Sequence, residues 1–501
     1  MSVTQQRASV SLSNLFPAAR LTRGNITVHA VCTAADRCQP GDLFVGVVTS
    51  EGDSHDDAAI AMAKGACGVL TERLLPLNVP QCIVEDTREA LGRVCQALAG
   101  NPCDELRTIG VVGTRGKTVT SLLLASMLEA AGEAVGVVSS IGLSDSMEQV
   151  VTPTSTPRAP KLAHWLERMT IAGAQSAVVE LSSKALAERR AAGMEFDAVV
   201  LTNLKRSEQP WHGTEENFRK ANLRALDMLK PGGFAVFNAD DVDSEQALAD
   251  VDLPVLTFGM ISSDAQVTAT VIERCPSEQT FLLQAGSESI PVRTAIIGDQ
   301  HVQNCLAAAA TGLAMGMDLA TIVRGLEAVK HVPGRLQRIE CGQDFNVFVD
   351  SARSPEALAA SLRTLRQAGT GRIICVMGCE GGKNKELRPR IGHVLDRCTQ
   401  LSIITSDDPR HEQPLQIAHD ILDGHERPHL THTIPNRAKA IRFALESARP
   451  GDTVIIAGKG DRCFQRIGSG KQQHDDCEVA RQWLYAQAEP APTRPQLRIF
   501  R

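Results

Sequence analysis

The sequence is poor in aromatic residues and has no extreme of charge. Phe, Trp and Tyr make up 3% of its 501 residues, and there is a single tyrosine. Proteins that bind single-stranded nucleic acid stack the bases on aromatic side chains, so this composition argues against such a platform. The formal net charge of -6 provides no basic surface either. A nucleic-acid partner is therefore not expected.

Long apolar runs are also missing. No stretch reaches the length that spans a bilayer, and residues 1–20 lack the charged-then-apolar pattern of a secretory signal. The fourteen cysteines show no zinc-type spacing, and the closest pair is Cys375 and Cys379. These absences predict a cytoplasmic protein with reduced thiols and no membrane insertion, and they do not favour a zinc site.

One short segment carries most of the chemical information. The apolar run 108–112 is typical of a buried strand, and residues 119–131 have the pattern of a helix. Between them the chain reads Gly113-Thr114-Arg115-Gly116-Lys117-Thr118. Such a loop holds nucleotide phosphates with its backbone N–H groups, while the lysine adds a positive charge and the threonine hydroxyl can ligate Mg²⁺. The general P-loop spacing requires a glycine at position 111, where this chain has Val111, so the loop is a shorter variant of that motif. The alternative is an ordinary turn that contains Gly-Lys-Thr by chance.

The alternation of apolar strands with helical segments predicts an α/β fold. From residue 107 onward, strands such as 177–181 and 234–238 alternate with helices, which is typical of a mostly parallel sheet covered on both faces. A second alternating set begins after residue 334 and predicts a separate doubly wound domain. We expect domains at 1–102, 103–334 and 335–488, followed by a loose tail at 489–501.

Several local motifs occur in the same order as in the Mur ligases of peptidoglycan synthesis, so the chain resembles that family. Within the family, it most resembles the ligases that add the third residue to UDP-N-acetylmuramoyl-dipeptide. Besides the glycine loop, the similar segments are Gly41-Asp42-Leu43-Phe44, Thr154-Ser155-Thr156-Pro157, Glu180-Leu181-Ser182-Ser183, Val332-Pro333-Gly334-Arg335, Asp407-Asp408-Pro409-Arg410 and Ala457-Gly458-Lys459-Gly460. The resemblance covers nearly the whole chain. It implies a UDP-sugar-binding first domain, a central ATP-binding domain with a P-loop-type parallel sheet, and a Rossmann-like last domain that binds an amino acid.

The resemblance implies an ATP-dependent amide ligase that acts as a monomer in cell-wall synthesis, and so in cell shape and division. ATP would phosphorylate a carboxylate of a UDP-N-acetylmuramoyl-peptide. The amine of an amino acid would then displace phosphate from the acyl phosphate. The protein would have to position three reactants and neutralise phosphate charge, with ATP and Mg²⁺ as cofactors.

The resemblance also implies roles for individual residues. Lys117, Glu180 and Glu208 would be catalytic, and Thr118, Glu180 and Glu208 would bind the metal. ATP would contact Gly113, Thr114, Arg115, Gly116, Lys117, Thr118, Val119, Asn304, Arg335 and Asp350. The UDP-sugar peptide would contact Thr154, Ser155, Thr156, Ser182, Glu188 and Arg190. The incoming amino acid would contact Lys383, Asp407, Asp408, Pro409, Arg410 and Gly458.

Simpler roles stay open for some of these residues. Glu180 could be an ordinary carboxylate at the end of a strand, and Arg335 could be a solvated hinge residue. Asp407 and Arg410 could belong to a turn, as residues around an Asp-Pro pair often do.

The sequence departs from the family pattern where the chemistry would take place. Arg115 stands in place of the loop asparagine, Asn222 in place of a carbamylated lysine, and Arg353 in place of a histidine. Glu208 aligns with a histidine that binds metal, and a carboxylate could preserve that function. Lys220 lies two residues before Asn222, so on a helix it points in another direction.

Substrate contacts also differ from the family pattern. Ala34 and Ala35 occupy two positions of the D-S-R motif that contacts the uridine half, and Lys383 replaces an arginine. Arg462 replaces the glutamate that grips the far amine of a diaminopimelate-type substrate, which reverses the charge. We therefore expect meso-diaminopimelate to be a poor substrate. Two hypotheses stay open: an active ligase with altered recognition, favoured by the retained nucleotide residues, and a non-catalytic homologue that binds nucleotide or protein partners.

Overall fold

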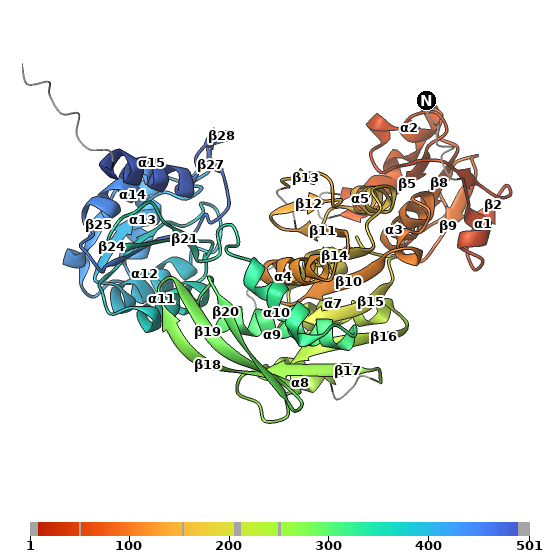
Figure 1. The fold of residues 1–501 in the computed structure, drawn as a ribbon. Helices are drawn as coiled ribbons and strands as arrows, with labels where there is room; N and C mark the ends of the chain where they lie inside the picture. The colour runs from red at the N-terminus through yellow and green to blue at the C-terminus, as the bar shows by residue number, and fades with distance from the viewer. Residues whose placement is uncertain (1–8, 50–51, 153–154, 205–211, 249–251, 489–501) are drawn as a thin grey trace, which may run out of the picture. The chain divides into compact units, whose positions relative to one another are not determined.

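The computed structural model describes residues 9–49, 52–152, 155–204, 212–248 and 252–488 (Figure 1). The chain divides into two units. One contains Met1–Ala269, Leu283–Ser289 and Gln303–Ala328, and the other contains Thr270–Leu282, Ile290–Val302 and Val329–Arg501. Three large sheets, of five, eleven and six strands, confirm the predicted α/β class. Among the described helices, none is both long enough and apolar enough to cross a bilayer.

The N-terminal sheet has the strand order β2-β9-β8-β5-β4. Its strands are β2 (Arg20–Thr22), β4 (Val31–Cys32), β5 (Leu43–Val45), β8 (Gly68–Thr71) and β9 (Gln81–Ile83). Alternate residues of a strand face opposite sides, so Phe44 packs in the cluster with α2 (Ala58–Ala63), while Leu43 packs in the cluster with α3 (Thr87–Leu98). The sheet is therefore covered on both faces. The smaller elements are β1 (Val10–Ser11), α1 (Leu12–Leu15), β3 (Thr27–Val28), β6 (Val48–Thr49) and β7 (Gly52–Asp53).

The central sheet has the order β13-β12-β11-β14-β10-β15-β16-β17-β18-β19-β20. Its strands are β10 (Arg107–Val112), β11 (Val135–Ser139), β12 (Gly142–Ser144), β13 (Gln149–Val150), β14 (Ser176–Glu180), β15 (Phe196–Leu201), β16 (Leu229–Asn238), β17 (Val255–Gly259), β18 (Val267–Cys275), β19 (Glu278–Ala285) and β20 (Glu288–Thr294). β10 runs parallel to both β14 and β15, and it is buried from Thr108 to Val112. Burial on both faces explains its unbroken apolar run.

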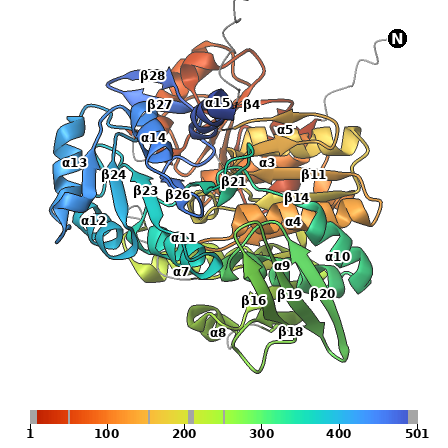
Figure 2. The same ribbon diagram turned by 60° about the vertical axis from the view of Figure 1, so that its left-hand side comes forward.

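Helices cover both faces of this sheet. They are α4 (Lys117–Ala130), α5 (Ala159–Ile171), α6 (Ser183–Ala187), α7 (Glu215–Leu223), α8 (Val242–Leu248), α9 (Asp299–Ala314) and α10 (Leu319–Ala328). In Figure 2, α4 and α5 lie on opposite sides of β11 and β14. A Cβ at Gly325 would lie 2.4 Å from Met127 Cα, so a glycine is needed where α10 crosses α4.

The C-terminal sheet has the order β21-β22-β26-β23-β24-β25. Its strands are β21 (Gln337–Ile339), β22 (Asn346–Asp350), β23 (Ile373–Met377), β24 (Leu401–Ile404), β25 (Thr431–Thr433) and β26 (Thr453–Ala457), with a separate hairpin, β27 (Phe464–Ile467) and β28 (Gly470–Gln473). One face carries α11 (Pro355–Ala368), α12 (Leu387–Cys398) and α13 (Pro414–Leu422), and the other carries α14 (Arg437–Glu446) and α15 (Asp476–Ala488) (Figure 2). The predicted doubly wound arrangement is thus confirmed.

Candidate active site

The loop 113–116 joins the end of β10 to the start of α4. Gly113 has a φ of 131° and Gly116 a φ of 86°, a region that glycine adopts without strain. A Cβ at Gly113 would lie 2.3 Å from Thr202 Oγ1, and a Cβ at Gly116 would lie 2.4 Å from Asn304 Oδ1. Conformation and close approach therefore both require glycine at these two positions.

Two residues after β15 fix the backbone of this loop. The carbonyl of Asn203 accepts a hydrogen bond from Thr114 N at 3.0 Å, and its Oδ1 accepts one from Arg115 N at 3.2 Å. Thr202 Oγ1 and Asn203 Nδ2 donate to the Arg115 carbonyl at 2.6 and 3.0 Å. These hydrogen bonds tie the loop to the segment that follows β15. Thr202 and Asn203 were not among the expected site residues, although the segment Thr202-Asn203-Leu204 is one of those that resemble the family pattern.

Lys117 is the first residue of α4, and its side chain folds back over the loop. Its Nζ donates hydrogen bonds to the carbonyls of Gly113 at 2.6 Å and Thr114 at 3.2 Å. The ammonium group therefore lies at the loop, beside the positive end of the α4 dipole. Phosphate groups bound there would be neutralised by both.

Glu180 reaches the start of α4 from the end of the neighbouring strand β14. Its Oε2 accepts hydrogen bonds from Thr118 Oγ1 and from Ser140 N, both at 3.0 Å. The hydroxyls of Thr118 and Ser140 are 2.8 Å apart. Glu180 and Thr118 are only 3% and 7% exposed. A carboxylate beside two hydroxyls is a set of hard oxygen donors, which suits Mg²⁺. Ser140 was not among the residues expected from the sequence.

The residues expected to contact the UDP-sugar peptide form one network at the same edge of the sheet. Thr156 Oγ1 donates to the Glu180 carbonyl at 2.8 Å and accepts from Ser182 N at 3.0 Å. Arg190 Nη1 donates to the Thr156 carbonyl at 2.8 Å, and its Nε pairs with Glu188 at 2.7 Å. Thr156 therefore links Ser182 and Arg190 to the end of β14, and Arg190 in turn holds Glu188. Ser155 directly precedes Thr156, whereas Thr154 lies outside the described residues.

Asn304 and Val119 are the other residues of this unit that are expected to contact the nucleotide. Asn304, on α9, accepts a hydrogen bond from Thr120 Oγ1 at 3.4 Å, which places it against the first turn of α4. Val119 is only 8% exposed, so its side chain belongs to the hydrophobic core.

The helix α7 carries Asn222, which by the resemblance stands in place of a carbamylated lysine. Asn222 is fully buried there; its Nδ2 donates to the Phe218 carbonyl at 2.8 Å, and its Oδ1 has no hydrogen-bond partner among the described residues. Lys220 is exposed and pairs with Glu216 at 2.7 Å, so it does not replace the missing group. Glu208 lies outside the described residues.

In the C-terminal unit, two adjacent aspartates contact a buried lysine. Lys459 Nζ lies 3.2 Å from Asp407 Oδ1 and 2.8 Å from Asp408 Oδ1, and all three side chains are buried. Asp407 Oδ2 has no partner among the described residues. A Cβ at Gly458 would lie 3.4 Å from this oxygen, so the glycine leaves room beside it. This oxygen therefore keeps an unused hydrogen-bond acceptor among the described residues.

Three cations surround Glu380 near these aspartates. Arg462 lies 2.6 Å from its carboxylate, Arg410 3.3 Å and Lys383 3.6 Å. Burial tends to raise the pKa of Glu380, but the hydrogen bond and charge of Arg462, helped by nearby cations, outweigh it and lower the pKa to about 2. Arg462 also lies 3.5 Å from Asp408, so two carboxylates, Glu380 and Asp408, face the three cations at this corner of the unit.

A fully buried ion pair supports the two loops that carry Asp407 and Gly458. Arg437 contacts both oxygens of Asp476 at 2.7 Å, and neither side chain is exposed. Arg437 also donates to the carbonyls of Ala457 at 2.9 Å and Ser406 at 3.5 Å, the residues directly before Gly458 and Asp407. No sequence pattern pointed to this pair.

Asp350 and Arg335, expected near the nucleotide, both belong to the C-terminal unit and both have partners within it. Asp350 accepts hydrogen bonds from Leu336 N at 3.2 Å and Ser361 Oγ at 2.5 Å. Arg335 lies 3.2 Å from Asp461.

Pro409 directly precedes Arg410. The φ of Arg410 is 55°, a left-handed conformation that is strained for any residue other than glycine.

Comparison with known proteins agrees with this arrangement. Residues 111–312 match the Mur ligase middle domain, and residues 334–460 match the Mur ligase, glutamate ligase domain. The UDP-N-acetylmuramoyl-L-alanyl-D-glutamate--2,6-diaminopimelate ligase of Geobacillus thermodenitrificans is 35% identical over 467 residues, which cover 91% of this chain and 95% of that protein. The protein of the same name from Bacillus cereus is 32% identical, covering 94% of this chain and 97% of that protein.

Solved structures lead to the same family. A structure of a UDP-N-acetylmuramoyl-L-alanyl-D-glutamate--2,6-diaminopimelate ligase superposes with a TM-score of 0.71 at 27% identity, covering 96% of this chain and 100% of that one. The MurF ligase of Thermotoga maritima, solved with ADP, has a TM-score of 0.62 at 17% identity, covers 91% and 98% of the two chains, and shows the shared fold alone. The chain belongs to the Mur ligase family, which confirms the resemblance drawn from the motifs.

Proposed function

We propose that this protein is an ATP-dependent amide ligase that joins an amino acid to UDP-N-acetylmuramoyl-dipeptide. The observation that carries the proposal is the oxygen cluster of Thr118, Ser140 and Glu180 beside the glycine loop. The names of the relatives supply the acceptor, since those proteins are ligases of a UDP-muramoyl dipeptide. They also favour a ligase over a non-catalytic homologue. We expect it to act as a monomer in the cytoplasm.

The loop and Lys117 would perform the first step. A carboxylate is a poor electrophile because its charge repels an amine. Transfer of the γ-phosphoryl group of ATP onto it creates an acyl phosphate with a good leaving group. The backbone N–H groups of the loop and the Lys117 ammonium would hold the phosphates and offset their charge.

Thr118 and Glu180 are the residues that would hold Mg²⁺. Their oxygens are 3.0 Å apart, and both side chains are buried next to the loop. Bound Mg²⁺ would supply positive charge that offsets the negative charge of the phosphates. The donor chemistry fits, because a hydroxyl and a carboxylate are both hard oxygen ligands. Glu208, which lies outside the described residues, remains a candidate for a further ligand.

The C-terminal unit would bind the incoming amino acid. Asp407 Oδ2 would accept a hydrogen bond from the amino group, and Arg410 and Lys383 would attract the carboxylate. Arg462 adds a further cation in this corner. We therefore propose a substrate whose side chain ends in an anionic or neutral group rather than an ammonium.

The proposal is tested by phosphate release from ATP in the presence of UDP-N-acetylmuramoyl-L-alanyl-D-glutamate and a panel of amino acids. We expect release with at least one amino acid and a product heavier by that residue in mass spectrometry. The Glu180→Gln variant is the matched inactive control, because it removes one charge and keeps the side-chain volume. Nucleotide binding without turnover across the panel would support the non-catalytic homologue instead.

A further inference from the structure

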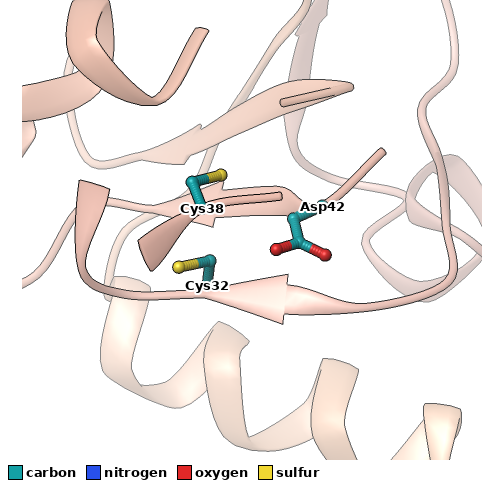
Figure 3. Close-up of side chains that lie close together, drawn as sticks. All are labelled: Cys32, Cys38 and Asp42. Atoms are coloured by element: carbon teal, nitrogen blue, oxygen red, sulfur yellow. The ribbon is translucent and has the colours of Figure 1, made fainter. Parts of the chain in front are cut away.

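Two thiols and a carboxylate lie close together in the N-terminal sheet, on a different sheet from the glycine loop. Cys32 is the last residue of β4, Cys38 follows the short 3-10 helix Ala35–Arg37, and Asp42 directly precedes β5. Figure 3 shows the three side chains side by side. Their sulfur and carboxylate oxygen atoms all lie within 4.8 Å of one another.

The backbone explains why these side chains meet. β4 and β5 are parallel neighbours, with Cys32 opposite Phe44, so the connection between them must return to the start of β5 beside β4. Gln39 N donates to Asp42 Oδ2 at 2.9 Å, which orients the carboxylate. Cys38 is buried, whereas Cys32 and Asp42 are half-buried, so the cluster can be reached from solvent.

Thiols in this position are poor acids when no cation is present. Burial, with a smaller contribution from the neighbouring Cys32 and Asp42, raises the pKa of Cys38 to about 11. A divalent cation reverses this effect, because it stabilises thiolates and releases their protons. Two sulfurs and one carboxylate oxygen match the preference of zinc for four ligands that include sulfur.

We propose that Cys32, Cys38 and Asp42 bind a zinc ion, with water as the fourth ligand. Cys67 is nearby, since its N–H donates to the Asp42 carbonyl at 2.9 Å, but its thiol is not among the ligand atoms that all lie within 4.8 Å of one another. The thiols of Cys32 and Cys38 donate to the carbonyls of Ala34 at 3.0 Å and Gln39 at 3.9 Å, contacts that zinc binding would replace. The ion closes the connection 33–41 and ties β4 to β5. β4 contains only two residues and lies at the edge of the sheet, so it gains most from such a link.

The test uses the full-length protein, stripped of metal under reducing conditions and titrated with Zn²⁺ against a chromophoric chelator. We expect one equivalent to bind, with affinity falling about 100-fold in Cys32→Ser or Cys38→Ser and about tenfold in Asp42→Asn. Cys67→Ser is the matched control and should retain the affinity. Co²⁺ should give a thiolate-to-cobalt charge-transfer band that is lost in the two serine variants. Absence of stoichiometric binding, or equal loss in Cys67→Ser, would overturn the assignment.

A second measurement needs no variant and so does not depend on the folding of one. Wild-type protein is alkylated with iodoacetamide with and without Zn²⁺, and each cysteine is followed by peptide mass spectrometry. Zinc should slow the labelling of Cys32 and leave the exposed Cys463 unchanged. Equal labelling of Cys32 in both samples, or a Cys32–Cys38 disulfide in place of a zinc site, would contradict the proposal.

Discussion

Thr118 Oγ1 lies 3.0 Å from Glu180 Oε2, although the two residues are 62 positions apart in the sequence. The parallel pairing of β10 with β14 explains this contact, because Val111 is opposite Glu180. The strand before the glycine loop and the strand that ends in the glutamate therefore finish at the same edge of the sheet. The carboxylate is delivered to the first turn of α4, where phosphates and Mg²⁺ would bind.

Replacing Glu180 by glutamine should reduce turnover about 100-fold and raise the Mg²⁺ concentration needed for half-maximal phosphate release, because a neutral amide is a weaker ligand than a carboxylate. Phosphate release measured across a Mg²⁺ titration checks this. Glu167→Gln, in an exposed ion pair with His164 on α5, is the control and should leave both values unchanged. A normal Mg²⁺ dependence in Glu180→Gln would remove Glu180 from the metal site.

Lys117→Ala should weaken Mg-ATP binding by about tenfold or more, which corresponds to about 1.4 kcal/mol. The reason is the loss of the ammonium that lies 2.6 Å from the Gly113 carbonyl, at the loop itself. Isothermal titration calorimetry with a nonhydrolysable ATP analogue measures the affinity. Lys161→Ala, on an exposed position of α5, should bind as the wild type does. Unchanged affinity in Lys117→Ala would place the nucleotide elsewhere.

Gly113→Ala should abolish nucleotide binding, because its Cβ would lie 2.3 Å from Thr202 Oγ1 and its φ of 131° disfavours any side chain. Gly132→Ala is a well-matched control. Gly132 also has a positive φ, of 91°, but a Cβ there would meet nothing within 4 Å. If both variants bind the nucleotide equally well, then close packing of the loop against Thr202 is not what shapes the site.

The sequence predicted the parts of this protein that depend on neighbours along the chain. The strand, glycine loop and helix around Lys117 could be recognised because apolar periodicity and glycine spacing are local signals. The contacts that fix the loop could not, since Asn203 lies 88 positions from Arg115. The ion pair of Arg437 and Asp476 could not be predicted either, because the two residues are 39 positions apart. The cluster that contains Cys32 and Cys38 could not be predicted because their spacing is not that of a common zinc motif.

The charge of the amino-acid pocket leads to a prediction about substrates. With Arg462 and two further cations around Glu380, meso-diaminopimelate should be coupled less efficiently than an amino acid with an acidic side chain. Arg462→Ala should raise kcat/KM for meso-diaminopimelate relative to the acidic substrate, because it removes the charge that repels the distal ammonium. Competition between the two amino acids, read by mass spectrometry of the products, measures this ratio. Efficient coupling of meso-diaminopimelate by the wild type would contradict the pocket assignment.

The buried pair of Arg437 and Asp476 should make the stability of the C-terminal unit depend on acidity. Burial opposes ionisation of Asp476, but the charge and hydrogen bonds of Arg437 outweigh it and lower the pKa to about 2. Because the folded pKa lies below the ordinary value of 3.8, the stabilisation is complete above about pH 4 and is lost as the pH falls towards 2.

Asp476→Asn leaves Arg437 buried without a counterion, which should cost about 3–5 kcal/mol near neutral pH. Urea unfolding followed by the fluorescence of Trp483, which packs against the hydrophobic core beneath α14 and α15, measures the difference from the wild type at each pH. That difference should shrink between pH 4 and 2, while the exposed Glu446→Gln variant should show no such change; a constant difference would mean that ionisation of Asp476 is not what stabilises the unit.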